Sequence, residues 1–163
     1  MQRISKENYY LNIAQTVLER ATCLRRVYGA IIVKNDEIIS TGYNGAPRGR
    51  QNCVDLGRCT REELQVPSGQ RYELCRSVHA EANAIISAAR RDMIGGTLYL
   101  VGRSAADGEL LHDTTSCAMC RRMIINSGIT RVVNRIGDDG IEIIDVQNWI
   151  VNDESIQPKA EAE

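Results

Sequence analysis

The order of helical and strand patterns along the chain constrains its fold more than any other feature. Apolar residues recur on one stripe from Ser5, a favoured N-cap residue, to about Ala21, which predicts a first helix. Further helices are expected over Ala80–Ala89 and Cys117–Asn126. Short runs rich in β-branched and aliphatic residues predict five strands, over Ala30–Val33, Glu37–Thr41, Thr97–Val101, Arg131–Asn134 and Ile141–Val146.

This order, α-β-β-α-β-α-β-β, predicts the α/β class, with a three-layer α/β/α sandwich around a five-stranded mixed sheet. Lys34-Asn35-Asp36 separates the first two strands and favours a hairpin. The 163 residues allow one full hydrophobic core and are too few for two ordinary domains. We therefore expect a single domain over residues 1–151 and a flexible C-terminal tail over residues 152–163.

Charge and hydropathy exclude several classes of partner. The formal net charge is −1, whereas domains that follow nucleic-acid phosphates usually carry a basic excess, so a polymer substrate is not expected. The chain has no apolar run of membrane-spanning length, and Met1–Tyr10 is too polar for a signal peptide. We expect a cytoplasmic protein, in which the six cysteines serve metal binding or catalysis, or are buried free thiols, and do not form disulfides.

Two short motifs carry the chemistry, His79-Ala80-Glu81 and Cys117-Ala118-Met119-Cys120, and each lies where a predicted helix begins. Two thiolates three residues apart on a first helical turn can bind one cation from the same side. The His79 imidazole completes a three-ligand site whose fourth tetrahedral position stays open, the arrangement typical of catalytic zinc. Two thiolates and a neutral imidazole also balance the charge of Zn²⁺.

Glu81 is close enough to His79 to face the open position without binding the metal itself. Zinc lowers the pKa of a bound water from about 15.7 to roughly 7. A carboxylate beside it can take that proton, pass it to a ring nitrogen and later protonate a leaving amine. The combined motifs predict a zinc-dependent deaminase. The alternative is a structural zinc knuckle with Cys59 or Cys75 as fourth ligand, which would not need the acid.

On these motifs the chain resembles the cytidine and deoxycytidylate deaminase superfamily, whose signature is His-x-Glu followed by Pro-Cys-x-x-Cys. The resemblance extends from about Tyr9 to Arg135. Within it, residues 40–47 (Ser-Thr-Gly-Tyr-Asn-Gly-Ala-Pro) and 79–85 (His-Ala-Glu-Ala-Asn-Ala-Ile) are similar to the deoxycytidylate (dCMP) branch. One departure is Ser116, which stands where the family has proline. Because serine is a good N-cap, we expect the helical turn to survive.

The resemblance implies hydrolytic deamination of dCMP to dUMP and ammonia, which supplies dUMP for thymidylate synthesis. It also implies a homo-oligomer, often a hexamer, with dCTP and dTTP as regulators. A deaminase of another cytosine nucleotide or base remains an alternative, as does a deaminase of tRNA adenosine, against which the low basic charge argues. A non-catalytic zinc-binding module is a third possibility, against which Glu81 argues.

Substrate contacts are expected beside the second strand and at the histidine motif. By the resemblance, Asn44 of the Gly-Tyr-Asn-Gly loop binds the nucleotide sugar, although such a sequence also suits a plain turn. Ala80 is expected in the same substrate site. Arg48 and Arg50 follow the loop and can pair with a 5′-phosphate, or are solvated loop charges.

Four cysteines outside the catalytic motif suggest a second zinc. Residues 42–77 are a long Gly- and Pro-containing stretch that a closed four-thiolate site would hold in place. By resemblance to some phage dCMP deaminases, Cys23 and Cys53 match second-zinc ligands. Cys59 and Cys75 are inferred to complete the set, and four unlinked thiols are the alternative.

Overall fold

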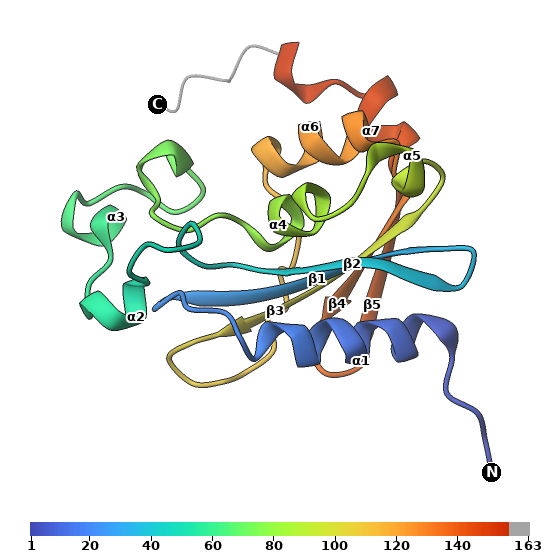
Figure 1. The fold of residues 1–163 in the computed structure, drawn as a ribbon, viewed down its shortest axis with the longest axis horizontal. Helices are drawn as coiled ribbons and strands as arrows, with labels where there is room; N and C mark the ends of the chain where they lie inside the picture. Colours follow the sequence, from blue (N-terminus) through green and yellow to red (C-terminus); the bar gives the residue numbers. More distant parts are fainter. Residues whose placement is uncertain (157–163) are drawn as a thin grey trace, which may run out of the picture.

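A five-stranded sheet in the order β2-β1-β3-β4-β5 forms the centre of the molecule (Figure 1). The computed structural model describes residues 1–156, so residues 157–163 of the expected tail lie outside the described part. Strands β3 and β4 are parallel and every other neighbouring pair is antiparallel, which confirms a mixed sheet. The strands are β1 (Arg26–Lys34), β2 (Glu37–Tyr43), β3 (Thr97–Ser104), β4 (Arg131–Ile136) and β5 (Gly140–Asp145).

Helices cover both faces of this sheet and confirm the three-layer α/β/α sandwich (Figure 1). Helix α1 (Lys6–Leu18) lies on one face, and α4 (Ala80–Ile86) and α6 (Ala118–Ser127) lie on the other. No helix within residues 1–156 is long and apolar enough to cross a membrane. The shorter helices are α2 (Cys53–Leu56), α3 (Thr60–Glu63), η1 (Tyr72–Leu74), α5 (Arg90–Met93), α7 (Gln147–Val151) and η2 (Glu154–Ile156).

The central strand β1 shows why both faces need a cover. Its alternate side chains enter two different apolar clusters: Ile31 and Val33 face the cluster under α1, and Ala30 and Ile32 face the cluster under α4 and α6. A strand buried on both faces reads as a continuous apolar run. Full burial of a side chain such as Ile31 or Ile32 contributes about 1.5–3 kcal/mol.

The predicted start of α1 and the predicted hairpin are both present. The Ser5 hydroxyl accepts a hydrogen bond from the Asn8 backbone N–H at 3.2 Å and so caps α1. Between β1 and β2, Asn35 and Asp36 have φ values of 50° and 65°. Positive φ at both central residues is what a type I′ hairpin turn requires.

Two glycines set how closely helices approach the sheet. A Cβ atom on Gly29 of β1 would lie 2.1 Å from the Ala14 carbonyl oxygen of α1. A Cβ atom on Gly42 of β2 would lie 2.3 Å from the Ala80 carbonyl oxygen of α4. Both glycines lie within strands, because β1 begins before its predicted start at Ala30 and β2 continues past its predicted end at Thr41.

The helix predicted over residues 80–89 is shorter, because α4 ends at Ile86. Ser87 follows as its C-cap, and the Ser87 hydroxyl donates to the Asn83 carbonyl at 2.8 Å. Side-chain bonds of this kind compete with the helical ladder. The separate helix α5 begins at Arg90, just beyond the predicted end of the helix at Ala89, and was not predicted.

Candidate metal centre and substrate cavity

Two helix N-termini on the same face of the sheet bring three metal-binding side chains together. His79 is the N-cap of α4 and Cys117 is the N-cap of α6. The Nδ1 atom of His79 lies 3.5 Å from the sulfur of Cys117 and 3.5 Å from the sulfur of Cys120. Within residues 1–156 these three form the single group of three or more His, Cys, Asp or Glu side chains placed to share one ion.

The donor set fits tetrahedral zinc. With Zn–S near 2.3 Å and Zn–N near 2.0–2.1 Å, a tetrahedral ion separates nitrogen from sulfur by roughly 3.5 Å, which is the separation observed. The hydrogen bond between the two thiols lowers the pKa of Cys117 and, together with burial, raises the pKa of Cys120. A divalent cation bound by both sulfurs favours the ionised form of each thiol.

The turn that leads into α6 differs from the expectation at Ser116. The N-cap is Cys117, whose sulfur accepts from the Cys120 backbone N–H at 3.5 Å. The expected Ser116 cap is therefore wrong, and its buried hydroxyl has no hydrogen-bond partner among the described residues. The turn itself survives, because the Arg121 side chain donates to the Ser116 carbonyl at 3.0 Å.

Glu81 lies in the first turn of α4, and only 4% of its surface is exposed. Burial raises the pKa of its carboxyl group, and the charge of His79 acts in the opposite direction. Burial pulls the pKa of His79 down, but the hydrogen bond to Cys117 and the charge of Glu81 outweigh it and leave that pKa raised. A buried carboxyl beside a metal-binding group has the environment of a residue that holds and releases a proton.

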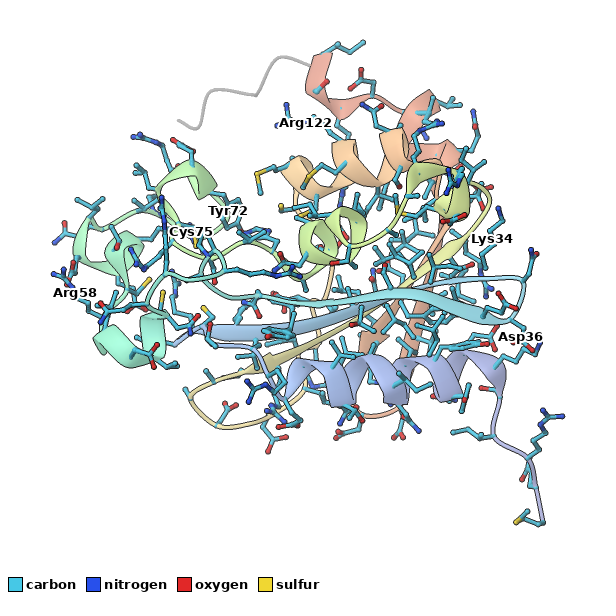
Figure 2. The ribbon with its side chains drawn as sticks, viewed as in Figure 1. Lys34, Asp36, Arg58, Tyr72, Cys75 and Arg122 are labelled. Carbon is cyan, nitrogen blue, oxygen red and sulfur yellow. The ribbon has the colours of Figure 1, made fainter. Side chains whose placement is uncertain are left out.

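Glu81 lines a cavity with about 830 Å³ of empty space, part of which is continuous with solvent. One wall is the stretch from α3 into α4, where Figure 2 labels Tyr72 and Cys75. The residues that line the cavity include Arg25, Arg26, Tyr28, Asn44, Cys59, Arg61, Ser68, Tyr72, Cys75, Ser77, His79, Ala80, Glu81 and Cys117.

Of the predicted substrate contacts, Ala80 and Asn44 line this cavity. The Asn44 side-chain amide also forms hydrogen bonds with the backbone of strand β1. Its oxygen accepts from the Tyr28 backbone N–H at 2.7 Å, and its nitrogen donates to the Arg26 carbonyl at 2.9 Å. The side chain thus joins the loop after β2 to the start of β1, in addition to any contact with a ligand.

Arg48 and Arg50 are not among the cavity-lining residues, and both lie on the exposed loop after β2. The chain turns outward after Pro47, where the Arg50 backbone N–H donates to the Pro47 carbonyl at 2.9 Å. Other cations occupy the cavity instead, namely Arg25, Arg26 and Arg61. The sequence pattern did not single them out, although Arg61 lies between two of the clustered cysteines.

The four remaining cysteines lie in one region without forming a ligand set. Cys23, Cys59 and Cys75 line the cavity and Cys53 is buried beside them. Burial raises the pKa of the Cys53 thiol, and the three neighbouring thiols add to the effect. Within residues 1–156 their sulfurs do not meet as a group placed to share one ion, in contrast to the His79 group.

Comparison with known proteins assigns the chain to a family. A family model described as the cytidine and deoxycytidylate deaminase zinc-binding region matches residues 4–135. The chain belongs to this family. Both motifs of the metal centre lie inside the matched range.

Relatives within the family differ in length. The deoxycytidylate deaminase of Mycobacterium phage D29 is 37% identical over 82% of this chain and 96% of its own length. That of Schizosaccharomyces pombe is 34% identical over 80% of this chain, which spans only 37% of the yeast protein. The structure of a dCMP deaminase from cyanophage S-TIM5 superposes with a TM-score of 0.58 at 25% identity, covering 85% of this chain and 88% of that one.

Replacing Asn44 tests how its side chain is used. Asn44→Ala leaves the Tyr28 N–H and the Arg26 carbonyl without their amide partners, so we expect the free energy of unfolding to fall by about 1–3 kcal/mol. Urea denaturation measures the loss, with the exposed neighbour Thr41→Ala as a control expected to stay within about 0.5 kcal/mol. An Asn44→Ala protein of unchanged stability would contradict the role in holding the loop.

Proposed function

We propose that this chain catalyses the hydrolytic deamination of dCMP to dUMP and ammonia. The observation that carries the proposal is the buried carboxyl of Glu81 in the cavity that His79 and Cys117 also line, with Cys120 completing their ligand group. Membership of the family supports a deaminase, and relatives named deoxycytidylate deaminase support dCMP as substrate. The dUMP formed would feed thymidylate synthesis. The free state of all six cysteines is in keeping with a cytoplasmic location.

Glu81 moves the protons in this proposal. It takes a proton from water as the water oxygen adds to C4 of cytosine, and it delivers that proton to N3. It then carries the proton of the new hydroxyl to the amino group, so that the C4–N4 bond breaks and ammonia leaves. The raised pKa of Glu81 suits a group that must both accept and donate within one turnover.

His79, Cys117 and Cys120 would hold the zinc ion. When bound, zinc supplies the Lewis acidity that makes water nucleophilic near neutral pH. The chain's own contribution is to fix the three donors, and a three-ligand site would leave one coordination position for water or substrate. His79 and Cys117 line the same cavity as Glu81. Ala80, between the two motif residues, forms part of the same wall.

Glu81→Gln tests the proton-transfer role. Glutamine keeps the size of the side chain but cannot exchange the proton, so we expect dCMP turnover to fall by about 10²–10⁴-fold with zinc content unchanged. Ammonia release from cytidine, CMP, dCMP, dCTP and tRNA, measured for this variant and the parent protein, also tests the substrate, and dCMP is expected to be preferred.

The matched control is Glu73→Gln, which changes an exposed carboxylate on the stretch before α4 that is paired with Arg71. It should retain parental turnover. Unchanged turnover in Glu81→Gln would overturn the mechanism. Activity on dCTP alone or on tRNA alone would overturn the choice of dCMP and favour another member of the deaminase class.

We infer that a second, structural zinc is bound by Cys23, Cys53, Cys59 and Cys75. The proximity of the four thiols supports this, since the charge of each of the other three bears on Cys53. Their sulfurs would have to move together to form the site, because they do not meet in the described structure. Four thiolates are a complete ligand set for structural zinc, which would bind residues 53–75 to the end of α1.

Metal analysis checks this second site. We expect two zinc ions per chain, falling to one in the double variant Cys59→Ser, Cys75→Ser because four-thiolate coordination is lost. Cys117→Ser serves as the comparison, since it is expected to remove the other zinc together with turnover. One zinc per chain in a fully active preparation would contradict the second site.

We further propose a homo-oligomer, with the hexamer as the expected form, regulated by dCTP and dTTP. An exposed apolar surface between α4 and α6 supports association: Ile86 is 73% exposed and lines a hollow with Met119 and Met123. Light scattering of the purified protein measures the number of chains. Assays with each nucleotide added measure the regulation.

A further inference from the structure

Arg61 places a fixed positive charge in the cavity. It lies in α3 with 7% of its surface exposed. One terminal nitrogen of its guanidinium donates to the Pro67 carbonyl at 3.0 Å and to the Gln70 carbonyl at 2.7 Å. The guanidinium lies over the ring of Tyr72, 4.6 Å from its centroid. These contacts hold the group in one orientation.

Tyr72 connects this charge to the metal centre. Its ring packs edge-on against the imidazole of His79, with 4.8 Å between the ring centroids. The Arg61 guanidinium and the His79 imidazole therefore contact the same aromatic ring, and both residues line the same cavity. A ligand whose reactive end lies at Glu81 and whose other end is anionic would extend in this direction.

The charge of Arg61 lacks the partner that neighbouring arginines have. Arg25 pairs with Glu62 at 3.1 Å and Arg26 pairs with Asp113 at 3.0 Å. Arg61 makes no ion pair with any residue in the range 1–156, and its Nε–H is buried without an acceptor there. A buried cation with an unsatisfied donor is costly unless an anion joins it.

A second donor in the same cavity is also unsatisfied. The Ser77 hydroxyl is buried and has no hydrogen-bond partner among the described residues. Both residues line the cavity, and two donors that lack partners suit the several acceptor oxygens of a phosphate better than a neutral group. By contrast, Arg48 and Arg50 lie outside the cavity.

We propose that Arg61 binds the 5′-phosphate of the nucleotide substrate and so selects a monophosphate over the free nucleoside. The assignment rests on the proposed function, because it takes the base to be at Glu81 and the metal centre. The planar fork of the guanidinium suits a phosphate, and its contacts with Pro67, Gln70 and Tyr72 fix it before the ligand arrives.

Arg61→Gln, assayed with dCMP and with deoxycytidine, tests this assignment. Loss of a charge-assisted contact to phosphate is expected to lower kcat/KM for dCMP by about 10–100-fold, mainly through KM. The value for deoxycytidine, which has no phosphate, is expected to change less than about threefold. Calorimetry with dUMP and deoxyuridine should show the same selective loss in binding.

Matched variants separate phosphate binding by Arg61 from a purely structural role. Arg58→Gln removes an exposed arginine of the same segment, paired with Glu63, and should leave both substrates unaffected. Arg61→Lys keeps the charge but not the fork, and it is expected to recover part of the preference for dCMP. It also provides a folded protein for the test should Arg61→Gln fail to fold.

Three outcomes would overturn the assignment. Equal losses with dCMP and deoxycytidine in both Arg61 variants would indicate a purely structural role. A selective loss only when dCTP is present would assign the phosphate to a regulator. Loss of the dCMP preference in Arg48→Gln, Arg50→Gln but not in Arg61→Gln would place the phosphate on that loop. Absence of ammonia release from dCMP by the parent protein is a separate result, which would overturn the proposed function.

Discussion

Helix α4 packs directly on strand β2, and the geometry of the metal centre depends on this contact. Gly42 has no side chain, which lets the first turn of α4 lie against the strand. The Ser40 hydroxyl donates to the Ala84 carbonyl at 2.7 Å, and the Asn83 amide donates to the Tyr43 carbonyl at 2.8 Å. With α4 held in this way, His79 meets the two sulfurs of α6 at 3.5 Å.

The cavity beyond this contact has two electrostatic ends. Glu81, His79 and Cys117 line one end, where a cation held by His79, Cys117 and the buried Cys120 would be stabilised. The arginines that line the cavity form an end that gains stability from an anion, and Arg61 is the one without a carboxylate partner among residues 1–156. A nucleotide would match both ends of the cavity, with its base at the metal centre and its phosphate at the arginines.

Much of the fold followed from local patterns, and the misses have physical causes. The apolar stripe of α1, its Ser5 cap and the Asn35-Asp36 turn are local signals, so α1 and the β1–β2 hairpin were predictable. The extension of β1 through Gly29 and of β2 through Gly42 was not predicted, and these are the positions where helices α1 and α4 pack closely on the strands. Helix α4 ends where the Ser87 hydroxyl donates to the Asn83 carbonyl.

The metal-binding residues were predictable, because both their ligand chemistry and their spacing in the sequence indicate a zinc site. His79, Cys117 and Cys120 had to meet if they were to share an ion, and the structure brings them together. Arg61 could not be identified as a cavity residue, because the path of residues 42–77 decides which of their cations turn inward. Arg48 and Arg50 follow the strand more closely in sequence, yet Arg61 lines the cavity after a long excursion of the chain.

Anomalous diffraction at the zinc edge, from crystals grown with dUMP, is the sharpest test of the metal centre and its proton carrier. We predict a zinc peak among His79 Nδ1, Cys117 Sγ and Cys120 Sγ, with a fourth ligand that does not come from the protein. A Glu81 carboxyl oxygen should lie within about 2.6–3.2 Å of that fourth ligand. A fourth position occupied by a protein side chain, or Glu81 itself bound to the ion, would contradict the proposed chemistry.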